Sequence, residues 1–518
     1  MTRVPFTIQA VADEANWRRD LAWPLAPERR ADIAERTVTA LRAWRKTLVS
    51  ATDKEIADLA SLHLLTIGAR AALYAHELSA AELANLKLTG SRPELAALRD
   101  GTSLAAPRRE FFEAPRRSRI PFARTLRAIR NARRWTPLHR LARAVLTPEA
   151  HVLSTGGLLI AAADGRSLSY ASPSEMIGQA RLTAAPARAD AATLAATWAR
   201  FLVTELDVPE RLRERASNLV RLQSEPALAR ADTDLAGLST VRDLPRNAWA
   251  GSAGSYATRA IGIEILRRGG SVRRFAHGGA VGLDDYGATH ALVDMAATSH
   301  YTVATEGVLS LLGESAIESA FDGAAPRFEA ARGDPKFRAV ARRGRPRPAG
   351  RPTILYVGTA FSGPLVHVPP IPPDAIYLDW QCRLMDSLAA LDADVWCKPH
   401  PENPVLSGAQ PLPALYPAMD TSFGEALARA DIVVFDYCLS TSFWEAVCSD
   451  RPIILMDLAG SRWRPQVRAM IDRRCRRIAV SHDSANRPQF DPAELADAVS
   501  VTRNADPSEF RRLLAGDA

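Results

Sequence analysis

Residues 395–403 read VWCKPHPEN and hold Lys398 and His400 in a run flanked by prolines. Lysine supplies a point charge and histidine a directional donor, and both suit a phosphate oxygen. Proline fixes φ and removes a backbone donor, so this loop is stiff and loses little entropy when a ligand binds. The segment is a candidate anion site. Taken alone, a rigid turn with a buried, hydrogen-bonded histidine is equally favoured.

A second candidate lies in DYCLSTSFWEAV, residues 436–447, where Ser440, Thr441 and Ser442 separate a strand-like run from a helix-like run. The start of a helix gathers unpaired N–H groups and the positive end of the helix dipole, so it favours anions. The hydroxyl groups could add hydrogen bonds to a phosphate, and Glu445 could hold ribose hydroxyls. The alternative is plain helix capping, with Ser442 and Glu445 forming a capping box.

A third candidate is the run His277-Gly-Gly, which follows the strand-like SVRRFA and precedes Asp284 and Asp285. A histidine or aspartate in this place could act as general base on an acceptor hydroxyl. The alternative is a glycine turn with a structural histidine. Gly358 and Thr359 follow another strand-like run, TILYV, where glycine would let backbone amides approach a ligand closely.

Metal-binding and P-loop chemistry are not expected. The acidic triplet DAD at residues 392–394 precedes its strand, and no Gly-x-x-x-x-Gly-Lys-Ser/Thr loop occurs. The segments above together predict a site for a nucleotide mono- or diphosphate that has no carboxylate cluster for a metal.

The elements around these segments alternate between strand and helix patterns. Residues 353–518 give strand runs separated by helical runs, which is typical of a parallel, doubly wound sheet, and residues 146–333 show a similar pattern. HVLSTGGLLIAAA, residues 151–163, is interpreted there as a strand or a strand pair. Such sheets bind ligands outside the carboxyl ends of their strands, where the candidate residues fall. The Arg-, Pro- and Gly-rich residues 334–352 are interpreted as a linker.

Residues 1–145 are predicted to form an all-α domain, because their apolar residues recur at spacings of three and four. Ser79 is an expected helix cap, with Glu82 at capping-box spacing. Residues 107–135 hold ten arginines against two glutamates, with aromatic residues between them. This segment could dock onto anionic lipid headgroups or an acidic acceptor, but a solvated basic face is favoured over that interpretation.

Composition limits the compartment and the partners. The chain has 518 residues, a formal net charge of +8 and mostly arginine among its cations, which favours anionic partners. Its five cysteines include no C-x-x-C pair, so neither a disulfide framework nor a structural zinc site is expected. Residues 1–17 contain no apolar run of signal-peptide length. We predict a cytoplasmic protein that touches a membrane from that side at most.

The order His-Gly-Gly, Lys-Pro-His-Pro and Asp-Tyr-x-x-Ser-Thr-Ser resembles that of GT-B-fold transferases of surface carbohydrate biosynthesis. One close likeness is a transferase family of surface-glycan gene clusters. CDP-glycerol glycerophosphotransferases share a His-Gly, a His-Pro and an Asp-Tyr-Ser-Ser segment. GT-B transferases that use CMP-sialic acid or CMP-Kdo share a His-Pro segment and a Ser-Ser/Thr segment. The resemblance covers roughly residues 245–460.

This resemblance implies two Rossmann-like domains in a GT-B arrangement, the first for the acceptor and the second for the nucleotide donor. It implies that His400 and the group Ser440 to Ser442 hold the donor phosphate, and that His277 corresponds to a histidine proposed as the base. One departure concerns the base of the sialic acid transferases, which lies in an Asp/Glu-Asp/Glu-Gly motif. Here Asp284-Asp285 is followed by an extra tyrosine before glycine.

We therefore predict a metal-independent glycosyltransferase that needs no cofactor. It would move a sugar, such as a nonulosonic acid or Kdo, from a nucleotide-activated donor that could be CMP-linked. The acceptor would be a surface glycan, a lipid-linked molecule or a protein, and nucleic acid is not an expected partner. The alternatives are polyol-phosphate transfer of the CDP-glycerol type, epimerisation of a nucleotide sugar, and glycan binding without catalysis.

Overall fold

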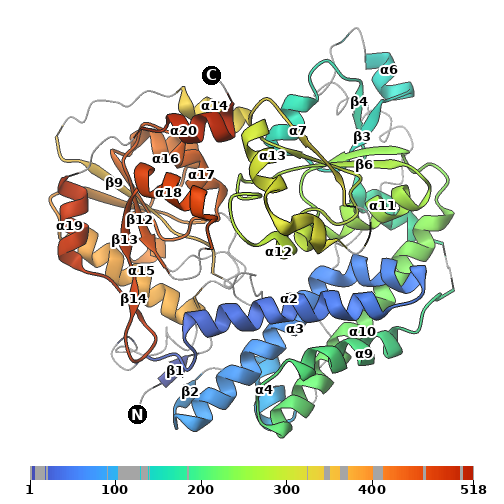
Figure 1. The fold of residues 1–518 in the computed structure, drawn as a ribbon, viewed down its shortest axis with the longest axis horizontal. Coiled ribbons are helices and arrows are strands. Elements are labelled where there is room, and N and C mark those ends of the chain that lie inside the picture. Colours follow the sequence, from blue (N-terminus) through green and yellow to red (C-terminus); the bar gives the residue numbers. More distant parts are fainter. Residues whose placement is uncertain are drawn as a thin grey trace.

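The computed structural model describes residues 3–5, 18, 21–89, 92–102, 129, 138, 141–183, 186–321, 323, 325–342, 350–361, 372–400, 412–458, 462–501 and 506–516. The basic segment 107–135, predicted to meet anionic lipid or an acidic acceptor, lies outside these residues except for position 129. The described chain is a mixed α/β structure in which two parallel sheets lie beside a layer of long helices (Figure 1).

The first sheet has the strand order β4-β3-β5-β6-β7-β8, and every neighbouring pair is parallel. Because β3 lies between β4 and β5, the direction of winding reverses between β3 and β5, and this reversal is the switch point of the sheet. Its strands are β3 (Ala150–Val152), β4 (Leu168–Tyr170), β5 (Asn247–Ala250), β6 (Ser271–Phe275), β7 (His300–Val303) and β8 (Arg327–Ala330).

The second sheet has the order β10-β9-β11-β12-β13, again parallel throughout, with its switch point between β9 and β11. All four residues of β11 are buried, as expected for a parallel strand covered by helices on both faces. This confirms the predicted parallel sheet. Its strands are β9 (Thr353–Val357), β10 (Asp394–Lys398), β11 (Ile432–Phe435), β12 (Ile453–Asp457) and β13 (Arg476–Ala479).

Shorter helices connect and cover the strands. The first sheet is accompanied by α6 (Leu141–Leu146), α7 (Gly157–Ala162), α8 (Pro173–Ala180), α11 (Tyr256–Arg267), α12 (Gly287–Val293), α13 (Glu306–Gly313) and η3 (Ala316–Ala320). The second is accompanied by α15 (Asp374–Ala389), η4 (Leu412–Ala414), α16 (Phe423–Arg429), α17 (Thr441–Val447), α18 (Pro465–Arg474) and α19 (Pro492–Ser500). Two small sheets pair β1 (Arg3–Pro5) with β2 (Lys87–Thr89) and β14 (Ser481–His482) with β15 (Pro488–Gln489). All five cysteines are free and buried.

The helical layer consists of α2 (Pro27–Thr47), α3 (Ala51–Leu83), α9 (Ala191–Thr204) and α10 (Glu210–Thr240), beside the short α4 (Pro93–Asp100) (Figure 1). It thus joins helices from both sides of residue 145, and the domain boundary expected there stays a prediction. The rings of Trp44 and Trp198, 5.8 Å apart, lie where α2 meets α9.

Helix α3 begins at the cap Ser50 and continues unbroken through Ser79. The predicted cap at Ser79 is therefore wrong, because burial of the surrounding apolar residues extends the helix past it. By length and composition α3 could cross a membrane, but 78% of its most apolar stretch is buried inside the protein. It is the core helix of the layer.

Two further expectations need correction. Residues 151–163 form β3 and then α7, so the strand pair is wrong; Gly156 starts a helix there. Residues 335–341 of the expected linker form α14 (Pro335–Ala341). Asp334 caps α14 by accepting a hydrogen bond from the Lys336 amide over 2.8 Å, and Pro335 stands at the first helical position, where its fixed φ suits a helix.

The end of the described chain returns to the first sheet. α20 (Ser508–Phe510) and η5 (Arg511–Ala515) follow the second sheet, yet η5 lies beside α13 and α14, and α20 lies near α14 in Figure 1. The Asp334 amide donates to the Leu514 carbonyl over 2.9 Å, and the Thr305 hydroxyl donates to the Leu513 carbonyl over 2.6 Å. The segment therefore fastens the two α/β units to each other.

Candidate functional site

The loop after β6 lies directly against the start of α17. Gly278 and Gly279 have φ of +82° and +88°, which side chains other than glycine rarely adopt. A Cβ atom on Gly278 would lie 2.7 Å from Oγ1 of Thr441, and one on Gly279 would lie 3.1 Å from the Trp444 ring. The structure thus brings together two sequence-predicted segments, the His277 loop and the Ser440–Ser442 group, from different sheets.

The hydroxyl group of Ser440 is engaged within the chain. Ser440 caps α17, and its Oγ accepts a hydrogen bond from the Phe443 amide over 3.2 Å. The helix that follows has seven residues. Capping, the alternative weighed for this serine cluster, is therefore the role of Ser440. Thr441 and Ser442 stay half-buried at the same edge.

Glu445 does not close a capping box with Ser442, because the cap is two residues earlier than expected. Its buried carboxylate forms an ion pair with Lys336, from α14. The ribose contact of Glu445 stays a prediction. Sequence reasoning missed Lys336 because it lies in the segment interpreted as a linker. The signal that could have found it is the cap sequence Asp334-Pro335 just before it.

Asp284 is held by a histidine that sequence reasoning missed. Nε2 of His290 lies 2.9 and 3.1 Å from the two carboxylate oxygens of Asp284, and its Nδ1 lies 3.0 Å from Oδ2 of Asp294. Burial lowers the pKa of His290, but the two carboxylates outweigh it and raise this pKa to about 10. The charged imidazolium of His290 is thus paired with the Asp284 carboxylate. The helical i, i+4 spacing of His290 and Asp294 was the available signal.

The Asp284 loop also pairs with the loop that follows β12. The Asp285 amide donates to the Arg462 carbonyl over 2.9 Å, and Asp284 forms an isolated antiparallel bridge with Trp463. This is a second place where the two α/β units meet. The side chains of Asp285 and His277 are both exposed, whereas Asp284 is buried. Of the three candidate bases, Asp285 and His277 can therefore reach a substrate.

His277 also lies close to the start of α14. Burial raises the pKa of the Asp334 carboxyl, and the charges of Lys336 and His277 oppose that rise. The same carboxylate would lie 2.7 Å from a Cβ atom on Gly157, at the start of α7. The Asp334 carboxylate therefore lies between the starts of α7 and α14, close enough to His277 to be influenced by its charge.

A buried carboxylate marks the switch point of the second sheet. Asp436, just after β11, accepts hydrogen bonds from the hydroxyl of Tyr356, the hydroxyl of Tyr377 over 3.0 Å and Nε1 of Trp380 over 3.0 Å. Burial raises the pKa of Asp436 to about 6, although these donors act to lower it. We call these four residues the Asp436 cage.

Gly358 and Thr359 close the top of the Asp436 cage. A Cβ atom on Gly358 would lie 2.5 Å from Nε2 of Gln381 and 2.9 Å from the Tyr356 hydroxyl. The Thr359 amide donates to the Tyr377 hydroxyl over 2.7 Å. Close packing therefore accounts for glycine at position 358, and the donor contact expected of these two residues stays a prediction.

Lys398 ends the edge strand β10, in register with Val357 of β9. Its Nζ donates to the Pro399 carbonyl over 3.3 Å, and His400 is half-buried just beyond. Because β10, β9 and β11 are parallel, this loop, the Asp436 cage and the start of α17 all lie at the carboxyl edge of the second sheet. Over the described ranges, no group of three or more His, Cys, Asp or Glu side chains is placed to hold a metal ion.

No family model and no curated protein matches the sequence. The solved structures that are similar to the chain include three glycosyltransferases. The glycotransferase of kitacinnamycin shows 14% identity, a TM-score of 0.32 and coverage of 71% of this chain and 94% of its own. A UDP-glucosyltransferase from Polygonum tinctorium shows 14% identity, a TM-score of 0.33 and coverage of 71% of this chain and 92% of its own. The glycosyltransferase SnogD from Streptomyces nogalater shows 12% identity, a TM-score of 0.26 and coverage of 70% of this chain and 97% of its own. With TM-scores this low, these similarities do not establish what this chain does.

Proposed function

We propose that the protein is a GT-B-type glycosyltransferase that moves a sugar from a nucleotide-activated donor to a glycan, lipid-linked or protein acceptor. The observation that carries this proposal is the packing of the His277-Gly-Gly loop on Thr441. It joins the carboxyl edges of two parallel sheets, which is where such sheets bind ligands. An acidic sugar, such as a nonulosonic acid or Kdo, suits the cationic chain.

On the donor side, the proposal assigns the leaving phosphate to Lys398, His400, Thr441 and Ser442. Negative charge develops on this phosphate as the bond to the sugar breaks, so preorganised donors aimed at it lower the barrier. The stiff Pro-His-Pro backbone holds His400 in place with little loss of entropy. Ser440 acts indirectly, because its hydroxyl is used to cap the helix that carries Thr441 and Ser442.

On the acceptor side, the proposal assigns the general base to Asp285 or His277. Either would take the proton of the acceptor hydroxyl while its oxygen displaces the nucleotide phosphate at the anomeric carbon. Asp284 positions this loop, because His290 already holds its carboxylate. The location proposed is the cytoplasm, peripheral to the inner face of the membrane through residues 107–135.

A thermal-shift panel of CMP, CDP, UDP, GDP and dTDP tests the proposal. A nucleotide that binds the native state raises the melting temperature by mass action, by an amount that grows with its concentration. We expect at least one nucleotide to do so, and His400→Ala to abolish the shift. Product analysis then separates the reactions: transfer that leaves no phosphate on the product supports sugar transfer over polyol-phosphate transfer.

A further inference from the structure

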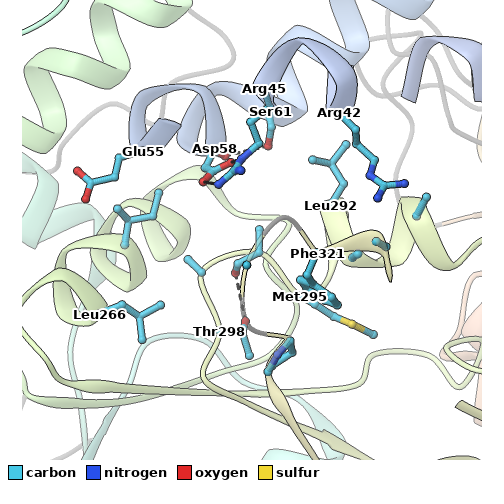
Figure 2. A pocket seen from close by; sticks show the side chains of 18 of the residues that line it. Arg42, Arg45, Glu55, Asp58, Ser61, Leu266, Leu292, Met295, Thr298 and Phe321 are labelled. Atoms are coloured by element: carbon cyan, nitrogen blue, oxygen red, sulfur yellow. Dashed lines mark hydrogen bonds and ion pairs between the residues drawn. The ribbon is translucent and has the colours of Figure 1, made fainter. Parts of the chain in front are cut away.

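A cavity lies away from the proposed donor site, between the helical layer and the first sheet (Figure 2). Its volume is about 350 Å³, room for roughly ten water molecules and within the size range of small-molecule sites. Helices α2 and α3 line one side, and α11, α12 and the loop after α12 line the other. None of the sequence-predicted site residues borders it.

The two sides of the cavity differ in chemistry. Leu266, Leu292, Met295 and Phe321 form an apolar wall, whereas charged side chains enter from α2 and α3 (Figure 2). Water gains few hydrogen bonds against an apolar wall, so an apolar body that displaces it is favoured. The ligand that fits both sides is therefore amphipathic.

Ion pairing determines which charged side chain of the cavity wall is available to a ligand. Arg45 is paired with Asp58, with Nη2 and Oδ2 2.7 Å apart. Arg267 makes two contacts of 2.8 Å with Glu264, a carboxylate that it shares with Arg268. Among the described residues, Arg42 is the arginine of the cavity wall that has no carboxylate partner.

Arg42 has unused hydrogen-bonding capacity. Its Nη2 donates to the Ser319 carbonyl over 2.9 Å. Its Nε is buried and has no hydrogen-bond partner, and among the described residues this side chain forms no ion pair. A buried, unpartnered guanidinium N–H is costly, and an anion removes that cost.

The cavity wall also contains a strained residue. Ala297 has φ of +52°, a left-handed conformation that is uncommon for alanine. Such strain persists where the surrounding structure enforces it, and it clusters at ligand sites. The strained loop, the unsatisfied Arg42 and the apolar wall thus occur in one cavity.

We propose that this cavity binds an amphipathic anion, a carboxylate or phosphate on an apolar chain, with Arg42 pairing the anionic group. The proposal does not depend on the glycosyltransferase assignment. The fatty carboxylate and the alkyl phosphate share this chemistry, and one probe of each kind distinguishes them.

Isothermal titration calorimetry of the full chain tests the proposal with four probes: octanoate, octyl phosphate, octanol and inorganic phosphate. We expect octanoate or octyl phosphate to bind at least about tenfold more tightly than octanol or phosphate alone, since both ends contribute. Arg42→Gln should weaken that binding by about tenfold or more, whereas Arg36→Gln, on the same helix but outside the cavity, should not change it.

A second variant guards against a folding artefact. Ala288→Phe narrows the cavity from α12 and should abolish binding of every probe while circular dichroism stays native. Failure of both octanoate and octyl phosphate to bind would overturn the proposal, as would equal binding by octanol or an unchanged affinity in Arg42→Gln. The nucleotide panel is read separately: Arg42→Gln should leave its shifts intact, so each proposal can fail alone.

Discussion

Gly278 and Thr441 lie so close that a single methyl group on Gly278 would stand 2.7 Å from the threonine hydroxyl oxygen. They belong to different sheets and are far apart in the sequence. Their contact fixes where the first α/β unit meets the second, and it places the exposed His277 beside the start of α17. The proposed chemistry depends on this contact.

Gly278→Ala should damage both stability and nucleotide binding. Its left-handed φ alone costs a non-glycine residue about 1–2 kcal/mol, and the clash with Thr441 adds to it. Gly269→Ala is the matched control, because Gly269 has φ of +73° and no atom within 4 Å of the added methyl. Urea denaturation of both variants separates the cost of the left-handed φ, which both share, from the clash with Thr441, which only Gly278→Ala has. Equal losses would contradict the close contact.

Replacement of His290 should destabilise the protein at neutral pH. His290→Asn leaves the buried carboxylate of Asp284 without its cation, and breaking a buried pair in this way costs about 3–5 kcal/mol. The direction of the pH dependence follows from the raised pKa of His290. The pKa of His290 is about 10 in the folded protein and 6.5 ordinarily, so the stability it contributes is full below pH 6.5 and is lost as pH rises toward 10.

Chemical denaturation at pH values from 6 to 9 measures this slope. Wild-type protein should lose stability as pH rises through this range, and His290→Asn should show a smaller loss. A parallel slope in the two proteins would argue against a charged His290 between the carboxylates.

Asp436 should give a second slope at lower pH. Its pKa is about 6 in the folded protein against an ordinary 3.8, so the folded state binds a proton that the unfolded state has already released. The stability that Asp436 contributes should therefore be highest below pH 4 and should fall as pH rises to about 6. Asp436→Asn cannot titrate, and the difference between variant and wild type, followed by denaturation from pH 4 to 6.5, should isolate this slope. A constant difference across that range would contradict it.

The choice between Asp285 and His277 can be settled by kinetics. Loss of a general base lowers turnover by about 10²–10⁴-fold, whereas loss of a neighbouring exposed side chain does not. We expect this loss in one of the two variants, Asp285→Asn or His277→Asn, with nucleotide binding retained in both. Asp284→Asn serves as the contrast, because it should lower stability through His290. Full activity in both exposed-site variants would refute the assignment of the base.

The sequence predicts local features of the fold well. The strands of the second sheet follow from short apolar runs separated by helical runs. The prediction was wrong at residues 156–162 and 334–341, which are rich in glycine and arginine, respectively. Helix α7 begins there after Gly156, and α14 begins at Pro335 after the cap Asp334. Composition there favoured a strand pair and a linker, but tertiary packing determined helices.

Contacts between distant segments were beyond sequence reasoning. The three candidate segments could be placed at strand ends, yet nothing local shows that Gly278 meets Thr441 or that Glu445 pairs with Lys336. For the same reason Asp284 was expected to be available as a base. Its partner His290 lies six residues further along the chain, and only the turn into α12 brings the two together.

Calorimetric titration of the wild-type chain and Thr441→Val with the five nucleotides of the panel tests the central claim most directly. We expect at least one nucleotide to bind wild type with one-to-one stoichiometry, and Thr441→Val to weaken this binding by about tenfold while the fold stays intact. Absence of binding by every nucleotide, or equal affinity in the two proteins, would contradict it.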